Sequence, residues 1–265
     1  MKRSDKPFHR PTDADDLELH PLVRQQLALE EAWRCLQCAD PPCQKGCPAS
    51  VPVKLFIRQL RNKDFRGAAV TIRLANPFGG SCGRVCAQAE QCQHDCTRAS
   101  IDRPIDIAML QRFACDHELS AGAVLPHVLP ATGKRVAVIG AGPAGLSAAA
   151  ELARLGHAVE VFEKASRPGG LLDGGIPPQR LPRQVVEHEV EAVRSAGVVI
   201  HTGRKIGSVA ELRPRFDGVV VAVGLCRPRR LGIKGEDADG VYQALEFLDA
   251  SARGEPPELG GRVLV

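Results

Sequence analysis

Eight of the ten cysteines in this chain of 265 residues fall into two groups between positions 35 and 96. The first group has the spacing Cys-x2-Cys-x4-Cys-x3-Cys-Pro and the second Cys-x3-Cys-x5-Cys-x3-Cys; their members are Cys35, Cys38, Cys43 and Cys47, and Cys82, Cys86, Cys92 and Cys96. The first residues of the chain lack the apolar segment of a signal peptide, so we expect a cytoplasmic protein, in which thiols stay reduced. Thiolates are soft ligands for Zn²⁺ and for iron–sulfur clusters, and we expect both groups to bind metal.

The spacing of the first group favours iron–sulfur clusters over zinc. Three cysteines in a compact run, with a fourth followed by Pro, form the ferredoxin arrangement, in which the fourth cysteine ligates the other cluster. Structural zinc sites use separated Cys-x2-Cys pairs. We therefore predict two clusters, with Cys47 joining the second group. The alternative is a zinc-stabilised nucleotide-binding protein without a redox role. His94 is interpreted as a loop residue near a cluster, and Cys115 and Cys226 as small, partly buried apolar side chains.

A second chemical signature is the motif Gly-x-Gly-x-x-Gly, formed by Gly140, Gly142 and Gly145. In a dinucleotide-binding fold, the first glycine makes a tight turn, the second lets the backbone approach a pyrophosphate, and the third lets the helix pack on the strand. The apolar residues 136–139 predict a buried parallel strand before the motif. The helix predicted over 146–155 would offer its N-terminal N–H groups to phosphate.

An acidic residue follows at the expected distance. A second strand is predicted over 159–162 and ends in Glu163, whose carboxylate can accept hydrogen bonds from ribose hydroxyls. The same carboxylate would repel a 2′-phosphate, so NADP is not expected at this site.

The remaining pattern predicts two kinds of domain. The first part has helical spacing over residues 22–33, 53–75 with a break near 63–67, and 107–118. The second part alternates a helix carrying Val186, Val190 and Val193 with strands over 198–201 and 219–223, while residues 167–182 are too rich in Gly and Pro for regular structure. The fold class is therefore multidomain: a helical N-terminal domain with two clusters, then an incomplete Rossmann-like α/β domain with a parallel sheet. The expected divisions are a mobile N-terminus (1–20), the cluster domain (21–118), a linker (119–133), a partial FAD-binding domain (134–258) and the start of an NAD(P)H-binding domain (259–265).

The composition argues against two classes of partner. The net charge of +4 is spread along the chain without a basic block, so nucleic acid is not expected. No apolar run reaches the ~20 residues of a membrane span.

Residues 30–265 resemble the electron-input part of the dihydropyrimidine dehydrogenase and glutamate synthase small-subunit family. The resemblance rests on both cysteine groups, on Cys96-Thr-Arg-Ala-Ser-Ile-Asp-Arg-Pro-Ile-Asp-Ile-Ala-Met-Leu-Gln-Arg-Phe, and on the loop Gly-Ile-Pro-Pro-Gln-Arg-Leu-Pro. Within that family, these segments are similar to the NAD-dependent bacterial dihydropyrimidine dehydrogenase type.

The resemblance implies a set of site residues. FAD would bind at the glycine motif, with Glu163, Lys164, Gly170, Leu171 and Arg180 at the contact positions. One 4Fe–4S cluster would be held by Cys35, Cys38, Cys43 and Gln111, and the other by Cys47, Cys86, Cys92 and Cys96, leaving Cys82 unused. An amide ligand is uncharged, so the cluster that Gln111 binds would have a different potential. A guanidinium such as that of Arg180 can pair with phosphate.

The resemblance also implies the function. NAD(P)H would give a hydride to FAD, and single electrons would pass through the clusters to a partner subunit that reduces uracil or thymine, or, alternatively, one that forms glutamate. No catalytic acid or base is needed for such a relay. A second glycine motif is missing, and Arg262-Val-Leu-Val resembles the start of another strand, so we expect a longer natural protein. We also expect residues 263–265 to be loosely held and this chain by itself to be inactive with NAD(P)H. A short protein that works without NAD(P)H is the alternative.

Overall fold

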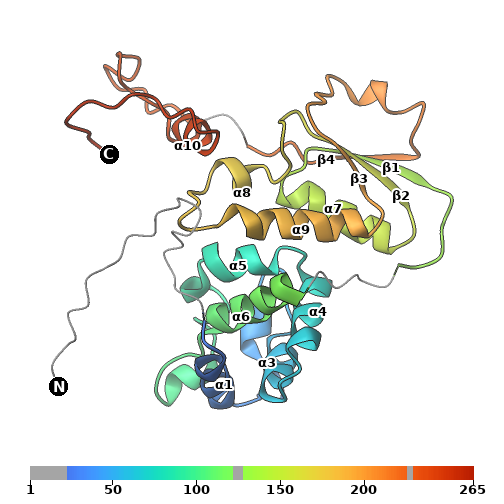
Figure 1. Ribbon diagram of the computed structural model, residues 1–265, viewed down its shortest axis with the longest axis vertical. Helices are drawn as coiled ribbons and strands as arrows, with labels where there is room; N and C mark the ends of the chain where they lie inside the picture. The colour runs from blue at the N-terminus through green and yellow to red at the C-terminus, as the bar shows by residue number, and fades with distance from the viewer. Residues whose placement is uncertain (1–22, 122–127, 226–228) are drawn as a thin grey trace.

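The computed structural model describes residues 23–121, 128–225 and 229–265. Figure 1 shows a helical domain made from the first part of the chain and, beside it, a parallel sheet with its own helices. This arrangement confirms the predicted fold class. The N-terminal segment 1–20, residues 122–127 of the expected linker, and Cys226 lie outside the described residues.

The helical domain contains six helices among the described residues. They are α1 (Gln25–Arg34), α2 (Pro42–Lys45), α3 (Val53–Arg61), α4 (Phe65–Ala75), α5 (Gly79–Val85) and α6 (Ile107–Ala121), with short 3₁₀ turns η2 (Gln88–Glu90) and η3 (Thr97–Ser100). The break predicted within 53–75 is confirmed: Lys63 has φ +58°, and Asp64 caps α4 by accepting a hydrogen bond from the Gly67 N–H at 2.8 Å.

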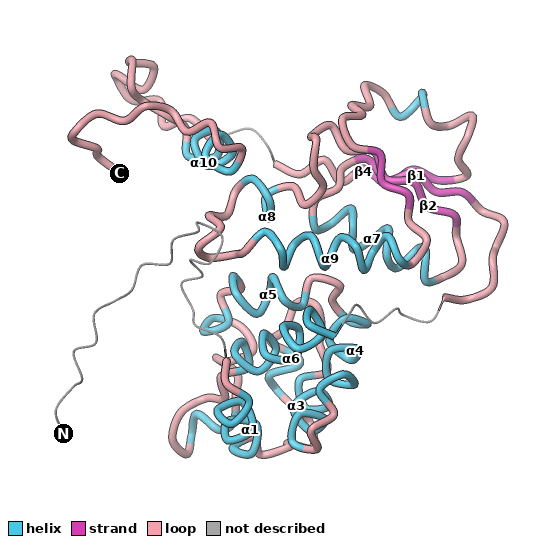
Figure 2. Tube along the Cα trace, viewed as in Figure 1, coloured by secondary structure: helices cyan, strands magenta, loops and turns pink. Residues whose placement is uncertain are grey.

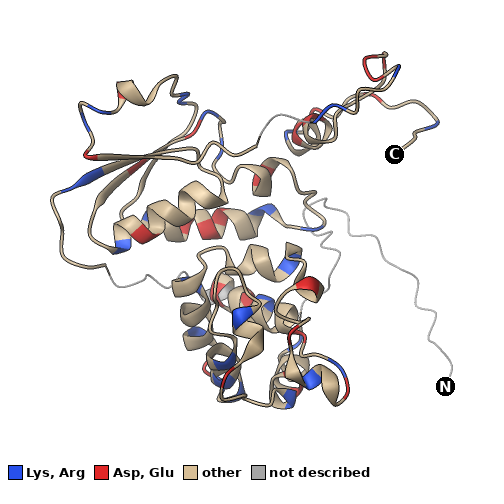
Figure 3. Cartoon of the chain, turned by 180° about the vertical axis from the view of Figure 1, so that it is seen from behind, with Lys and Arg blue, Asp and Glu red and all other residues tan. Residues whose placement is uncertain are grey.

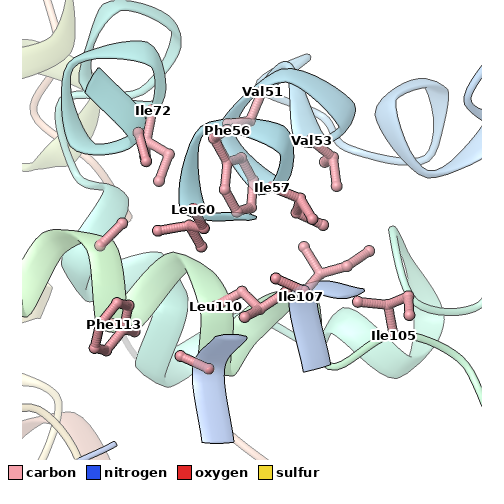
Figure 4. Close-up of a cluster of buried hydrophobic side chains, with 14 of the residues drawn as sticks. Val51, Val53, Phe56, Ile57, Leu60, Ile72, Ile105, Ile107, Leu110 and Phe113 are labelled. Atoms are coloured by element: carbon pink, nitrogen blue, oxygen red, sulfur yellow. The ribbon is translucent and has the colours of Figure 1, made fainter. Parts of the chain in front are cut away.

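The core of this domain forms where α3, α4 and α6 meet. Apolar residues of α3 recur at the spacing that places them on one helix face, namely Val53, Phe56, Ile57 and Leu60. Figure 4 shows these side chains packed with Ile72 of α4 and with Ile107, Leu110 and Phe113 of α6. Full burial of one such side chain stabilises the fold by about 1.5–3 kcal/mol.

The second domain is built on a four-stranded parallel sheet in the order β3-β2-β1-β4. The strands are β1 (Arg135–Ile139), β2 (Ala158–Phe162), β3 (Val199–His201) and β4 (Gly218–Val221), and the helices are α7 (Pro143–Arg154), α8 (Leu171–Gly174), α9 (Arg183–Ser195) and α10 (Ala244–Ala252), with the 3₁₀ turn η4 (Val209–Glu211). In Figure 2, α7 and α9 cover the face of the sheet that is turned toward the helical domain. On the opposite face, Ala137, Ile139 and Phe162 pack against Leu212 and Phe216.

Several segments differ from the sequence-based prediction. Residues 167–182, expected to be irregular, contain the short helix α8, and α5 and α10 were not predicted. The final residues, expected to start a strand, form no strand in the described part of the chain, and the side chains of Leu264 and Val265 are fully exposed. A strand requires a neighbouring strand to pair with its backbone groups, and the four described strands lie elsewhere.

Charge is mixed over both domains. From behind, Figure 3 shows Asp and Glu interspersed with Lys and Arg rather than gathered in one block. In the three described stretches, none of the helices has the combination of length and hydropathy needed to cross a bilayer.

Candidate cluster and dinucleotide sites

Four cysteine side chains line one pocket of the helical domain. They are Cys35, Cys38, Cys43 and Cys96, and the wall between them is apolar, with Val53, Ile57, Ile105 and Ile107 among its residues. Burial, together with the charges of the neighbouring thiols, Cys96 first among them, raises the pKa of the Cys43 thiol to about 12. Thiolates crowded into an apolar pocket repel each other, so a bound cationic iron centre would stabilise them.

Ion pairs bring Cys96 to the first three cysteines. Arg34 directly precedes Cys35, and its guanidinium donates to Asp102 Oδ1 at 2.9 Å. Arg98, two residues after Cys96, donates to both oxygens of the same carboxylate at 2.8 and 2.9 Å, and to the carbonyl oxygen of Arg34 at 3.1 Å. These contacts join segments more than 60 residues apart in sequence at the edge of the pocket.

A buried carboxylate supports the same edge from inside. Glu31 is only 4% exposed, and it accepts hydrogen bonds from the guanidinium groups of Arg34 and Arg103 and from the Asp106 N–H, at 2.6, 2.7 and 2.8 Å. Burial alone would raise the pKa of Glu31, but these donors hold it below its usual range. Glu31 thus fixes the end of α1 to the segment that enters α6.

The position of Cys96 differs from the grouping implied by the resemblance. That grouping assigned Gln111 to Cys35, Cys38 and Cys43, whereas the structure has Cys96 lining their pocket. Gln111 is buried next to α5 instead, where its Nε2 donates to the Gly79 carbonyl oxygen at 2.7 Å. The reason is the set of long-range ion pairs around Arg34 and Arg98, which no local spacing reveals.

The ferredoxin-like spacing predicts that Cys47 joins the second group of thiols. Burial, together with the charges of Cys47 and Cys86, raises the pKa of Cys92 to about 11. Cys82 and Cys86 share a hydrogen bond that lowers the pKa of Cys86 and raises that of Cys82. The Asn76 amide also donates to Cys82 Sγ at 3.2 Å.

Among the described residues, no three His, Cys, Asp or Glu side chains are arranged around a single metal ion. In the first pocket, the four thiols are instead distributed over the walls of the cavity.

The glycine motif forms a tight turn between β1 and α7. A Cβ on Gly140, which has φ +102°, would lie 2.4 Å from the Ala222 carbonyl oxygen, and one on Gly145 would lie 2.0 Å from the Gly140 carbonyl oxygen. A Cβ on Gly142 would meet no atom within 4 Å. The first and third glycines are therefore required by packing, while the backbone at Gly142 faces open space that a pyrophosphate could occupy.

Glu163 lies beneath this turn. Its side chain is 7% exposed, and its two oxygens accept hydrogen bonds from the Ala141 N–H at 2.7 Å and the Ala165 N–H at 2.8 Å. The predicted ribose acceptor is thus also a support for the glycine turn. The sequence pattern gave no signal for this second role, because the Ala141 N–H is a backbone group.

The segment after β2 folds back onto the same turn. The Gly169 N–H donates to the Ala141 carbonyl oxygen at 2.8 Å, and a Cβ on Gly170, which has φ +57°, would lie 2.8 Å from the Gly142 Cα. Lys164, Leu171 and Arg180 have exposed side chains. The structure therefore brings the three motif glycines, Glu163 and Gly170 together.

The comparisons with known proteins divide the chain in the same way. Residues 13–123 match the family model described as dihydropyrimidine dehydrogenase domain II, 4Fe–4S cluster, and residues 138–197 match an NAD(P)-binding Rossmann-like domain. The NAD-dependent dihydropyrimidine dehydrogenase subunit PreT of Salmonella typhimurium is 41% identical over 241 residues, and that of Escherichia coli K12 is 43% identical over 241 residues.

Both alignments cover 90% of this chain and 58% of the relative, so the chain spans a little over half the length of these subunits. Glutamate synthase (NADH) of Schizosaccharomyces pombe is 36% identical over 256 residues, which cover 93% of this chain and 12% of that protein. The chain, in which a 4Fe–4S cluster domain is joined to a Rossmann-like dinucleotide-binding domain, is thus similar in sequence to the PreT subunits and to glutamate synthase.

Proposed function

We propose that this chain is the electron-input part of an NAD(P)H-dependent iron–sulfur flavoprotein oxidoreductase of the dihydropyrimidine dehydrogenase type. The observation that carries the proposal is the contact between α5, which leads into the second cysteine group, and α9 of the dinucleotide-binding domain. That contact places the second group of thiols beside the dinucleotide-binding domain, and electron transfer requires bound cofactors to lie close together.

FAD is the proposed nucleotide at the glycine turn. FAD would accept one hydride, which carries two electrons, from NAD(P)H and would release the electrons one at a time, and the 4Fe–4S clusters would conduct them. The N-terminal N–H groups of α7 would bind the pyrophosphate at Gly142, Glu163 would orient the ribose, and Gly170 would keep its segment close to the turn. Lys164, Leu171 and Arg180 would contribute from the exposed side of the site.

The proposed ligands follow the positions of the side chains. Cys35, Cys38, Cys43 and Cys96 would hold the first cluster, because all four line one pocket.

Cys47, Cys86 and Cys92 would hold the second cluster, with the Gln111 amide oxygen as the fourth ligand. Two observations support Gln111 over Cys82. The amide nitrogen of Gln111 donates a hydrogen bond to the Gly79 carbonyl oxygen, so the amide oxygen of Gln111 is the atom that would bind iron. The Cys82 thiol already accepts a hydrogen bond from the Asn76 amide at 3.2 Å.

The proposed partner is a subunit that reduces a pyrimidine such as uracil or thymine, in a hetero-oligomer located in the cytoplasm. This choice follows from the names of the two bacterial relatives. Electron input to a glutamate-forming partner is the second candidate, supported by the identity to glutamate synthase. Co-purification followed by assays of uracil reduction and of glutamate formation distinguishes the two.

A reconstitution experiment tests the proposal at the level of this chain. The protein is loaded with FAD and with iron and sulfide, then titrated anaerobically with dithionite. We expect about eight irons and one flavin per chain, and two distinct cluster signals in electron paramagnetic resonance (EPR) spectra. A colourless protein that takes up zinc and no iron would contradict the proposal.

A further inference from the structure

Helix α5 lies at the boundary of the two domains, directly beside α9 (Figure 1). Its first turn is bound by a carboxylate from the other domain. Glu189 of α9 is 2% exposed, and its Oε1 accepts hydrogen bonds from the Gly80 N–H at 2.7 Å and the Ser81 N–H at 3.0 Å. Its Oε2 accepts a further hydrogen bond from the Ser81 hydroxyl.

The same turn is bound from the other side by a proposed cluster ligand. The carbonyl oxygen of Gly79 accepts the hydrogen bond from Gln111 Nε2. The adjoining part of α5 packs tightly on α6, since a Cβ on Gly83 would lie 2.9 Å from the Arg112 nitrogen. At its other end α5 runs into Cys86, whose N–H donates to the Cys82 carbonyl oxygen at 3.2 Å. One short helix thus connects Glu189 with two proposed ligands of the second cluster.

We propose that Glu189 is a positioning residue for the second cluster. It holds the first turn of α5 in place. As a result, the amide oxygen of Gln111 and the thiol of Cys86 keep a fixed geometry. The inference rests on the proposed function, and it adds a residue of the dinucleotide-binding domain that tunes a cluster in the other domain. Glu189 acts through α5 and touches neither cofactor site.

The specific alternative is that Glu189 only stabilises the domain boundary. A purely structural role would lower the stability of the whole protein and leave the properties of each loaded cluster unchanged. A positioning role changes the second cluster alone, because the first pocket is lined by the segment after α1, by α2 and α3, and by the segment that leads into α6, and the hydrogen bonds of Glu189 go to α5.

The test compares three variants of the full chain, loaded with FAD and clusters. Glu189→Gln keeps the shape of the side chain: the amide oxygen can accept the two N–H bonds, and the amide nitrogen can donate to the Ser81 hydroxyl. Glu189→Ala removes all of these contacts. Glu187→Gln makes the same chemical change at an exposed position of the same helix and is the matched control.

We expect Glu189→Ala to change the ratio of reduced to oxidised second cluster by tenfold or more at a fixed potential, equivalent to ~59 mV for a one-electron couple. Its EPR signal should change as well, while the signal and potential of the first cluster stay as in the wild type. Glu189→Gln should restore most of the wild-type behaviour, and Glu187→Gln should match the wild type. If Glu189→Ala does not fold, Ser81→Ala, which deletes only the hydroxyl contact, should show a smaller shift in the same cluster.

Two results would overturn the inference. The first is an unchanged signal and potential of the second cluster in Glu189→Ala, or in Ser81→Ala where Glu189→Ala does not fold. The second is an equal change in both clusters. If the wild type itself binds no flavin and no clusters, the proposed function fails, and the role of Glu189 fails with it. If the wild type binds both and the variants behave like it, only the role of Glu189 is wrong.

Discussion

Replacing Glu163 separates support of the glycine turn from binding of the nucleotide. In Glu163→Ala the buried Ala141 N–H loses its acceptor, whereas the Ala165 N–H lies on an exposed residue and can turn to water. A hydrogen bond to a charged acceptor contributes about 1.5–3 kcal/mol, and an unsatisfied buried donor costs about 1–3 kcal/mol. We therefore expect the protein without FAD to lose about 2–4 kcal/mol of its free energy of unfolding.

Glu163→Gln should lose less free energy of unfolding, because its amide oxygen can still accept a hydrogen bond from the Ala141 N–H while the amide nitrogen faces the exposed side. Urea unfolding of the FAD-free protein measures these changes, and a flavin titration measures affinity, which should fall at least tenfold for Glu163→Ala. Glu160→Ala, on the same strand, is the control, because its carboxylate makes partly exposed ion pairs with Arg135 and His201 that contribute about 0–1 kcal/mol. Wild-type stability of FAD-free Glu163→Ala would refute the supporting role.

Three further predictions concern the clusters, the loop over the glycine turn and the domain boundary. Cys96→Ser should abolish the same EPR signal as Cys38→Ser, while Cys82→Ser should keep both clusters; loss of the other signal in Cys96→Ser would contradict the grouping around the first pocket. Gly170→Ala should weaken FAD binding by tenfold or more in a flavin titration, because its Cβ would lie 2.8 Å from the glycine turn at a φ of +57°; unchanged affinity would mean that the loop moves freely. Burial raises the pKa of Glu189 from 4.5 to about 7, although its hydrogen bonds act in the opposite direction. The unfolded chain therefore releases this proton at a lower pH than the folded protein does. The free energy of unfolding should fall by about 3 kcal/mol as the pH rises from about 4.5 to 7. Glu189→Gln should flatten this part of the pH–stability curve in urea unfolding, and an identical curve would show that Glu189 does not titrate there.

Local patterns were sufficient to predict much of the fold. The strand, glycine turn and helix around residues 135–154 depend on neighbours in sequence, and the structure has them as predicted. Helix α5 could not be predicted, because three of its seven residues are glycine and its sequence disfavours a helix. It forms because α6 packs against it and Glu189 binds its first turn. Helix α10 has an ordinary apolar pattern, so its sequence does carry a helical signal.

In the candidate site too, features that depend on local sequence could be predicted, and features that depend on long-range contacts could not. The glycine turn follows from spacing, and the crossing of Cys47 to the second group remains a prediction from spacing. Cys96 lines the first pocket because of ion pairs between residues far apart in sequence, such as Arg34 with Asp102. The spacing of the cysteines does not reveal these ion pairs. The hydrogen bonds of Glu163 to backbone N–H groups were hidden for a similar reason, because every residue except proline has such a group.

The frame around the first pocket has a consequence for oxidative damage and repair. Glu31 and the arginines that it binds fix the end of α1 to the entry of α6 through groups of the protein alone. If oxidants strip iron from this pocket, we expect those ion pairs to remain and the four thiols to stay close to their places. Reloading would then require reduction of the thiols and delivery of iron and sulfide, without refolding of the domain.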